Sequence, residues 1–277
     1  MSIRIVTDSS CDLPQELVRK HNITVIPLYI NVGLQEYRDG IDLSRQEFYT
    51  RLPDFRQVPT TAAPSPEVFR LTYERLATEG ASQILSIHIS TRLSSVFGIA
   101  SQAVREKTSL PVTVFDSRQL SLGTGFQVLA AAQAAEAGCS MQEILARLED
   151  QITHTHVFAA LDTLEFLRRS GRMNFAVAFL GGILQIKPFL KMYAGKPTAE
   201  RVRTRNAAMN RLVELLEEAS PLEKVAVLHS QALDRAEVLL QRVKHILPAG
   251  DTLVEEINPV LGAHIGPGVV GFACISK

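Results

Sequence analysis

The stretch "QILSIHISTRLSSVFGIASQAVREKTSLPVTVFDS", residues 83–117, decides the fold class of this chain. Residues 83–90 form a short apolar run that ends in polar residues, and residues 111–117 form another, as expected of two buried strands. Residues 94–107 between them have the pattern of a helix. A strand, a helix and a second strand in this order predict a mostly parallel sheet flanked by helices.

The alternation of strands and helices continues in both directions through the first half of the chain. We expect further strands at residues 3–10 and 24–32. Helices are expected at residues 12–22, 44–52, 67–80, 125–138 and 140–152. Asp12 is a candidate cap of the first helix, while Ser44–Glu47 and Ser140–Glu143 have the spacing of capping boxes.

A second unit is predicted to begin near Ile152. We therefore divide the chain into two α/β domains, an N-terminal one at residues 1–152 and a C-terminal one at residues 153–277. Residues 185–203 of the second domain predict two strands around an Ala-Gly-Lys turn. Other strands are expected at 156–161, 224–230 and 252–257, and helices at 163–171, 175–184, 206–219 and 234–247.

The composition is that of a packed globular protein, with 46% hydrophobic and 21% charged residues in 277. Lys plus Arg equals Asp plus Glu at 29 each, so nothing favours a nucleic-acid partner. Three widely spaced cysteines predict a reducing compartment, because their odd number leaves no complete disulfide framework. The longest apolar run, residues 175–186, is shorter than the roughly 20 residues of a membrane span. We expect a soluble, cytoplasmic protein.

Small polar residues follow three predicted strands of the first domain: Asp8, Ser9, Ser90, Ser94 and Ser117. Ligands usually bind beyond the carboxyl ends of strands in an open α/β sheet, so these residues are candidates to hold an anionic group. The alternative is that they are ordinary helix caps.

A second candidate is the stretch "NPVLGAHIGPGVVGF", residues 258–272, which we expect to be a stiff loop that carries His264.

Motifs of familiar enzymes are missing from the sequence, including the P-loop, G-x-S-x-G and G-x-G-x-x-G. His154 and His156 share one face of a strand, but no neighbouring ligand completes a metal site.

Taken together, eight motifs resemble the DegV family, which includes the fatty-acid-binding FakB proteins of bacteria. The motifs are "TDSSCDLP", "PTTAAPSPEVF", "ISTRLSSVFGIA", "VFDSRQLSLGTG", "DTLEFLRRSGRM", "LQIKPFLKMYAGK", "RTRNAA" and "GAHIGPGVVG", in this order along nearly the whole chain. The resemblance implies a protein that encloses one long-chain fatty acid between two domains and has no catalytic centre or cofactor. It also implies that the protein presents the acid to a separate ATP-dependent fatty acid kinase and so supplies phospholipid precursors.

The family's carboxylate-binding residues correspond to Thr61, Ser94 and His264. Further head-group contacts are expected from the neighbouring residues Thr60, Ser95 and Gly266. The resemblance places Arg172 and Arg203 at the domain interface or at the surface that meets the kinase. The tail would lie in an apolar tunnel, for which residues 175–184 and 186–190 are candidate lining.

The chain departs from the family pattern at four positions near this expected site. The family has serine, glycine, threonine and threonine at the positions of Ala62, Ser95, Val96 and Ile265, so hydroxyl groups are removed or moved in this chain.

Two other functions remain open. One is a small acyl hydrolase or transferase with Ser94 as nucleophile and His264 as base. The other is an interaction module that binds a partner protein without lipid.

Overall fold

The computed structural model describes residues 2–106, 108–172 and 187–277. Four parallel strands form its first sheet, in the order β2-β1-β6-β7. Their bounds are Ile3–Asp8 for β1, Thr24–Ile26 for β2, Gln83–His88 for β6 and Val112–Asp116 for β7. The quoted stretch therefore supplies two neighbouring strands of this sheet and the helix that connects them.

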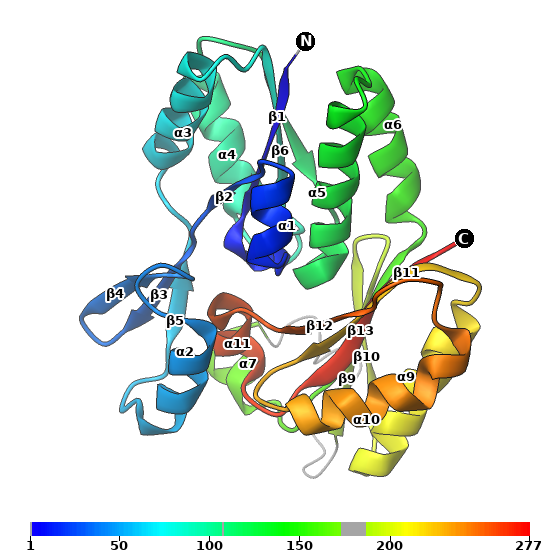
Figure 1. Ribbon diagram of the computed structural model, residues 1–277. Helices are drawn as coiled ribbons and strands as arrows, with labels where there is room; N and C mark the ends of the chain where they lie inside the picture. The colour runs from blue at the N-terminus through cyan, green and yellow to red at the C-terminus, as the bar shows by residue number, and fades with distance from the viewer. Residues whose placement is uncertain (1, 107, 173–186) are drawn as a thin grey trace.

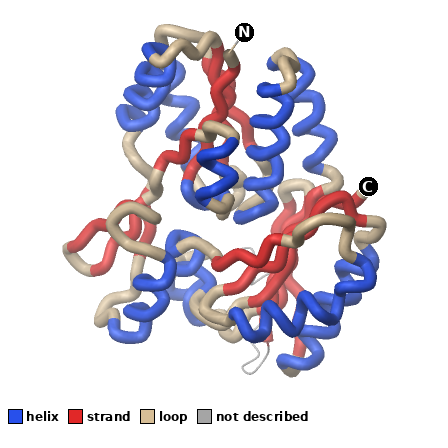
Figure 2. The backbone as a smooth tube through the Cα atoms, viewed as in Figure 1, coloured by secondary structure: helices blue, strands red, loops and turns tan. Residues whose placement is uncertain are grey.

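Helices lie on both sides of the first sheet (Figures 1 and 2). α3 and α4 pack together on one side, and α5 and α6 pack together on the other. The helices around this sheet are α1 (Gln15–Lys20), α3 (Pro66–Thr78), α4 (Val96–Arg105), α5 (Ser121–Glu136) and α6 (Met141–Ile152), with a 3-10 turn, η1, at Ser9–Cys11. The predicted α/β class, with a parallel sheet flanked by helices, is confirmed.

The second sheet has six described strands in the order β10-β9-β8-β13-β11-β12, of which β11 and β12 are parallel and the other neighbours antiparallel. The strands are β8 (Thr155–Ala160), β9 (Lys187–Tyr193), β10 (Lys196–Val202), β11 (Leu222–His229), β12 (Leu253–Glu256) and β13 (Val270–Ser276). The described helices of this half are α7 (Glu165–Arg169), α9 (Arg205–Glu218), α10 (Leu233–Val243) and α11 (Pro259–Ile265), with a 3-10 turn, η3, at Lys244–Ile246. The turn between β9 and β10 is the predicted one.

Both faces of this second sheet are buried. Side chains alternate between the two faces of a strand. In β13, Phe272 and Cys274 join the hydrophobic cluster beneath α9 and α10, while Ala273 and Ile275 join the cluster shared with the first half. Burial on both faces explains why the last strand is an almost continuous apolar run in the sequence.

Helix α5 lies at the centre of the molecule, and most of its residues are buried. Close approach depends on small residues: a Cβ on Gly125 would lie 2.5 Å from the carbonyl oxygen of Cys11, and one on Gly123 would lie 2.7 Å from Cγ2 of Val157. α5 contacts β1 and β6 of the first sheet and β8 and β13 of the second. One hydrophobic cluster consequently runs through both halves of the chain.

A third, smaller sheet corrects one prediction. Residues 24–32 were expected to form one strand, but Pro27, which lacks a backbone N–H, separates β2 from β3. The N–H of Leu28 instead donates to Ser9 Oγ at 3.1 Å. The third sheet has the order β4-β3-β5, with β3 at Tyr29–Val32, β4 at Gln35–Arg38 and β5 at Thr60–Ala62. Between β4 and β5 the chain forms α2 (Arg45–Arg51) and the 3-10 turn η2 (Leu52–Asp54).

The expectation of a loop around His264 is wrong, because this residue lies in the last turn of α11. Asn258 caps the helix by accepting a hydrogen bond from the N–H of Leu261 at 2.9 Å. Pro259 occupies the first turn, where a missing N–H costs nothing. Gly266 ends the helix at a φ of 73°, a backbone angle that favours glycine.

Predictions about helix caps have mixed outcomes. The capping box of Ser140 with Glu143 is confirmed, and Ser44 Oγ accepts from the N–H of Glu47 at 3.2 Å. Asp12 does not cap α1: it has a φ of 56° at the end of η1, and its carboxylate points to other parts of the chain. The cap position of α1 is Pro14.

Two further expectations stay predictions. Residues 175–184, predicted as a buried helix and tunnel lining, lie outside the described residues. The division at residue 152 falls between the end of α6 and the start of β8.

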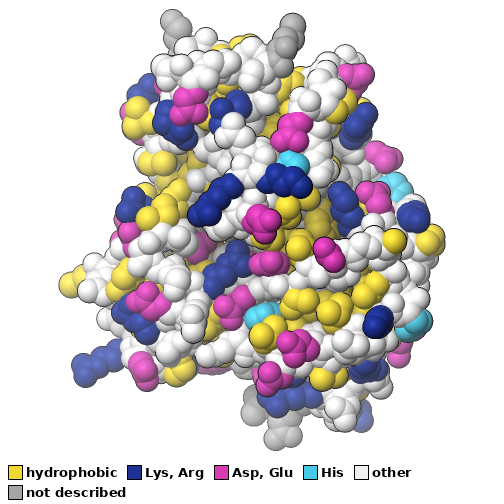
Figure 3. Space-filling model, in the orientation of Figure 1, with side chains coloured by type: hydrophobic (Ala, Val, Ile, Leu, Met, Phe, Trp, Pro, Cys, Tyr) yellow, Lys and Arg dark blue, Asp and Glu magenta, His cyan; other side chains and the backbone are white. Residues whose placement is uncertain are grey.

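None of the helices in the described ranges is long and apolar enough to cross a membrane. On the face in Figure 3, acidic and basic side chains are interspersed, in keeping with their equal numbers.

Gly262→Ala is expected to destabilise the protein, because the new Cβ would lie 2.4 Å from Oη of Tyr49. Crowding of this kind costs roughly 1–3 kcal/mol. The control is Gly98→Ala in α4, where a Cβ meets nothing within 4 Å and should stabilise the helix by up to about 1 kcal/mol. Urea unfolding measures both variants, and equal stability of the two would contradict the packing described for α11.

Candidate binding site between the two halves

A cavity of about 190 Å³ lies where the two halves of the chain meet. Its polar lining residues are Thr61, Ser94, Ser95, Arg172 and His264. Its apolar lining residues are Leu28, Ala62, Ala63, Ile89, Leu93, Val96, Leu120, Leu167, Val260 and Leu261. Five polar groups converging on an otherwise apolar surface are typical of a site for an amphiphilic small molecule.

Thr61 reaches the cavity from β5, where it pairs with Ile30 of β3. The Thr61 side chain is partly buried, whereas Thr60, one residue earlier on the strand, is exposed and does not line the cavity. This difference follows from the alternation of side chains along a strand. The structure therefore separates two threonines that are equivalent in the sequence.

Ser94 and Ser95 lie at the start of α4. Ser94 Oγ accepts from the N–H of Val96 at 3.4 Å, and Ser95 occupies the cap position without a side-chain hydrogen bond. The amino end of a helix carries partial positive charge and unpaired N–H groups, which favour an anion. This wall of the cavity can thus offer both hydroxyl groups and helix N–H groups to a carboxylate.

His264 approaches the same point from α11, and its Nε2 lies 2.9 Å from Oγ1 of Thr61. Burial and, to a smaller extent, the nearby charge of Arg172 lower the pKa of His264 to about 4. The ring is therefore neutral at neutral pH, with one donor and one acceptor nitrogen. Its Nδ1 is buried and has no hydrogen-bond partner among the described residues.

Arg172 is positioned by the end of α7. Gly171, with a φ of 72°, donates to the carbonyl of Arg168, and Arg172 donates to the carbonyl of Leu167. This pair of bonds is a Schellman motif, which turns the chain sharply after a helix. It places the exposed residue Arg172 at the rim of the cavity, where its guanidinium donates to the carbonyl of Ser170 at 2.7 Å and lies within electrostatic reach of His264.

Two other expected site residues lie elsewhere. Arg203 is exposed in the turn between β10 and α9 and does not line the cavity. Gly266 is also outside the lining: a Cβ there would lie 2.2 Å from the ring of Phe166, so its described role is to let α11 pack on α7. A head-group contact for Thr60 and Gly266 stays a prediction without support from this geometry.

Comparison with known proteins identifies the family. The model of the DegV family matches residues 2–277. The chain belongs to the DegV family. A DegV domain-containing protein of Streptomyces coelicolor is 37% identical over 280 residues, which cover 99% of each chain. The motifs quoted from the sequence thus led to the correct family.

Solved structures of the DegV family share the whole fold. A DegV family protein from Thermus thermophilus, described as binding fatty acid, superimposes with a TM-score of 0.91 at 36% identity. DegV of Bacillus subtilis, described as a fatty acid binding protein, superimposes with a TM-score of 0.92 at 30% identity. In each case the match covers 100% of both chains.

The polar residues at the strand ends of this DegV family chain have different surroundings. Asp8 is fully buried and bonds to Nδ1 of His88 at 2.9 Å, and His88 Nε2 lies 2.7 Å from Oγ of Ser86. Burial raises the pKa of Asp8, but hydrogen bonds from His88 and Ser10 outweigh this effect and lower it. Sequence reasoning missed this Ser-His-Asp arrangement because Ser86 and His88 lie within a strand.

The Ser86–His88–Asp8 arrangement resembles a hydrolase triad in its connections. All three side chains have 0% exposure, and Ser86 Oγ is also 2.9 Å from Oη of Tyr73. A substrate cannot reach a serine in this position, so the network serves the core. Ser117, at the next strand end, is likewise buried and bonded to Thr124.

The arrangement also gives no support to a hydrolase based on Ser94 and His264. The described hydrogen bond of His264 goes to Thr61, and none joins it to Ser94 or to a carboxylate. Activation of a serine requires a base within hydrogen-bond reach. Within the described ranges, moreover, no group of three His, Cys, Asp or Glu side chains is placed to hold a metal ion.

The low pKa of His264 predicts a pH-dependent stability. The unfolded chain takes up a proton near pH 6.5, whereas the folded state resists protonation until about pH 4. The free energy of unfolding should therefore fall as pH decreases from 6.5 to 4, by roughly 3 kcal/mol from this residue. His264→Gln should remove this part of the decrease, as measured by urea unfolding at several pH values. Identical pH profiles for the two proteins would contradict the burial of a neutral ring.

Proposed function

We propose that the protein binds one long-chain fatty acid, with its carboxylate at Thr61, Ser94 and His264 and its tail between the two halves of the chain. The observation that carries this proposal is that these three side chains, from three distant segments, line one largely apolar cavity, in which Thr61 and His264 are hydrogen-bonded. The descriptions of the DegV family structures from Thermus thermophilus and Bacillus subtilis support it.

The polar end of the cavity suits a carboxylate. A buried carboxylate without hydrogen bonds is costly, and hydrogen bonds to a charged group are about twice as strong as those between neutral groups. With the ring neutral, Nδ1–H of His264 would donate to the carboxylate while Nε2 accepts from the hydroxyl of Thr61, and the hydroxyl of Ser94 would supply a second donor. Because His264 is neutral without ligand, Arg172 and the start of α4 are the sources of positive potential.

The apolar lining suits a hydrocarbon tail, since burying each methylene contributes about 0.8 kcal/mol. The volume of about 190 Å³ is below the ~300–1,000 Å³ of common ligand pockets. We infer that this space holds the carboxylate and the first methylenes, and that the rest of the tail extends further between the halves. Three of the four departures from the family pattern, at Ala62, Ser95 and Val96, line this space, so they act on the head-group end.

We further infer that the protein is a carrier without turnover, which presents the acid to an ATP-dependent fatty acid kinase. The kinase would transfer the terminal phosphoryl group of ATP to a carboxylate oxygen, giving an acyl phosphate and ADP. Partial exposure of Ser95 and Arg172 beside the carboxylate end supports access from outside. We place the carrier in the cytoplasm, where such a kinase would find ATP.

Native mass spectrometry with organic extraction tests the ligand first: one acyl chain per protein is expected. Thr61→Val should weaken binding of a fluorescent fatty acid by roughly 10- to 100-fold, because it removes the hydroxyl that holds His264 in the tautomer that donates to the carboxylate. Ser94→Ala and His264→Gln should act in the same direction.

The matched control is Thr60→Val, on the exposed side of the same strand, which should bind with unchanged affinity. Equal losses for Thr60→Val and Thr61→Val would place the carboxylate elsewhere. A protein that neither carries nor takes up fatty acid would refute the proposed function.

Arg203→Ala is expected to leave fatty-acid affinity unchanged, because Arg203 lies away from the cavity. With a purified fatty acid kinase, the same variant should slow formation of acyl phosphate if Arg203 contacts the kinase. Arg201→Ala, which removes an equally exposed charge from the preceding strand, is the control. A similar rate for both variants would assign the effect to general charge, and a loss of lipid binding would mean that Arg203 acts at the cavity.

A further inference from the structure

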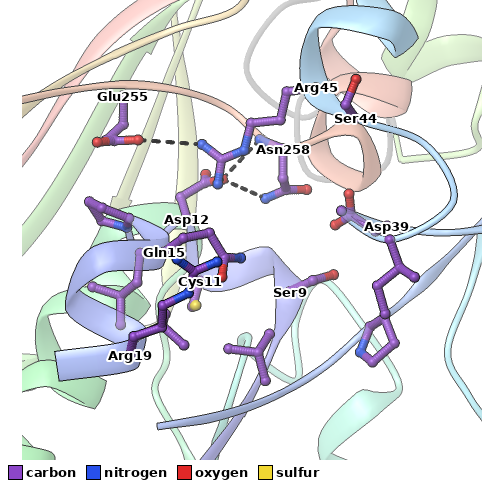
Figure 4. Close-up of a pocket in the computed structure, with 17 residues that line it drawn as sticks. Ser9, Cys11, Asp12, Gln15, Arg19, Asp39, Ser44, Arg45, Glu255 and Asn258 are labelled. Carbon is purple, nitrogen blue, oxygen red and sulfur yellow. Dashed lines mark hydrogen bonds and ion pairs between the residues drawn. The ribbon is translucent and has the colours of Figure 1, made fainter. Parts of the chain in front are cut away.

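The turn at residues 8–12, "DSSCD", covers the end of β1, the turn η1 and the residue after it. None of these residues, all within the described part of the chain, lines the cavity of about 190 Å³. Ser9, Cys11 and Asp12 instead line a separate cavity of about 760 Å³ (Figure 4). Helix α5 packs directly on the turn, because Gly125 leaves no room for a Cβ beside the carbonyl of Cys11. The turn is therefore a fixed point in the core, from which polar side chains reach other segments.

The first of these side chains, Asp8, holds the segment that leads to Ser94. Its Oδ2 accepts from Nδ1 of His88 at 2.9 Å and from the N–H of Ile89 at 3.3 Å. The carbonyl of the next residue, Ser90, accepts from the N–H of Ser94 at 3.1 Å. Ile89 and Ser94 both line the smaller cavity. Asp8 thus fixes the wall that carries Ser94 without lining the cavity itself.

The second side chain, Ser9, holds the strand beside Thr61. Its Oγ accepts from the N–H of Leu28 at 3.1 Å, and the carbonyl of Leu28 accepts from the N–H of Asp39 at 2.9 Å. Leu28 lines the smaller cavity and precedes β3, in which Ile30 pairs with Thr61 of β5. The position of Thr61 therefore depends on a strand that is attached to the turn through Ser9.

The third side chain, Asp12, holds the start of the helix that carries His264. Its Oδ1 accepts from N and Nδ2 of Asn258 at 2.8 and 2.9 Å. Arg45 lies 3.4 Å from the same oxygen and also donates to the carbonyl of Glu256, so both residues hold the chain just before α11 (Figure 4). The start of α11, and with it the place of His264, is set from this turn.

The contacts of the turn are buried and directional. Asp8 and Asp12 are 0% and 1% exposed, so moving a partner away would leave a buried charge without its hydrogen bonds, which is costly. Hydrogen bonds to a ligand weaken steeply when the angle at the donor departs from a straight line. A binding site therefore needs its side chains held to within about 0.5 Å by the residues around them.

We propose that the turn at residues 8–12 positions the head-group site, by fixing the three segments that supply the carboxylate-binding side chains. Asp8, Ser9 and Asp12 are then positioning residues, which act through other residues and do not touch the ligand. The effect on affinity rests on the proposed function. The hydrogen bond between Thr61 and His264 is present without ligand and tests the positioning separately.

Ser9→Ala and Asn258→Ser test two of the three connections with the mildest changes, because Asp8 and Asp12 are buried charges. Ser9→Ala removes the acceptor for the N–H of Leu28. Asn258→Ser keeps a residue type that caps helices but removes the amide that donates to Asp12. Each variant should weaken binding of a fluorescent fatty acid by roughly 3- to 10-fold.

Double-mutant cycles identify the route of each effect. The loss caused by Ser9→Ala should largely disappear in a Thr61→Val background, because the side chain that it positions is already changed. The loss caused by Asn258→Ser should largely disappear in a His264→Gln background for the same reason. Additive losses in both cycles would overturn the inference, since the variants would then act independently of the head-group residues.

Ser140→Ala is the matched control, because it removes the side-chain cap of α6, a helix that lines neither of the two cavities. It should lower the midpoint of urea unfolding, as the other two variants do, and leave fatty-acid affinity unchanged. A similar loss of affinity in Ser140→Ala would assign all the effects to stability and overturn the positioning role.

A measurement without ligand separates this inference from the proposed function. The ¹⁵N shifts of the His264 ring, assigned by their loss in His264→Gln, report which nitrogen carries the proton. In the parent and in Ser140→Ala, the bond to Thr61 should hold the ring in one neutral tautomer at pH 7. Asn258→Ser should give a mixture of both tautomers.

The outcomes for the two proposals differ. If the parent binds no fatty acid, the proposed function fails, and the ring tautomer in Asn258→Ser still decides whether the turn positions His264. A ring tautomer that matches the parent would overturn the positioning role. Parent-like affinity of both Ser9→Ala and Asn258→Ser, in a protein that does bind fatty acid, would overturn it as well and leave the proposed function standing.

Discussion

The buried carboxylate of Asp12 is the contact on which the arrangement of both cavities depends. It accepts hydrogen bonds from Asn258 and Ser121 and pairs with Arg45. Asn258 caps α11, Ser121 begins α5 and Arg45 begins α2, so one side chain fixes the starts of three helices from distant parts of the chain. Burial raises the pKa of Asp12 although Arg45 and the hydrogen bonds oppose the shift. Removing any partner of such a buried group is strongly destabilising, which makes the network a unit.

Helix α11 connects this network to the cavity proposed to bind the fatty acid. Its cap, Asn258, lines a cavity of about 760 Å³. Val260, Leu261 and His264 line the cavity of about 190 Å³. The helix has seven residues, about two turns, so the two cavities lie a short distance apart along one rigid element. The placement of His264 beside Thr61 thus depends on contacts made at the other end of the helix. Thr61 and His264 are far apart in the sequence, and the packing of α11 brings them together.

Much of this organisation follows from local sequence. The strand, helix and strand at residues 83–117 were predictable because their apolar patterns are strong and their turns are polar. The three residues that line one cavity, Thr61, Ser94 and His264, were predicted from the family resemblance. Nothing else in the sequence indicates that these positions lie in one site. The break at Pro27 and the helix that carries His264 were missed although Pro27, Asn258 and Pro259 are signals for them. The buried Ser86–His88–Asp8 network could not be predicted, because it depends on the pairing of β1 with β6 in the tertiary fold.

The central position of α5 has a consequence for how a ligand exchanges. Because this helix packs on both sheets, the two halves share one hydrophobic cluster. Swinging the halves apart would expose that cluster to water, at about 25 cal/mol for each Å² of apolar surface. A fatty acid bound as proposed would therefore leave through local displacement of side chains and short segments rather than through opening of a hinge. Its residence time would then be set by the rate of those local openings.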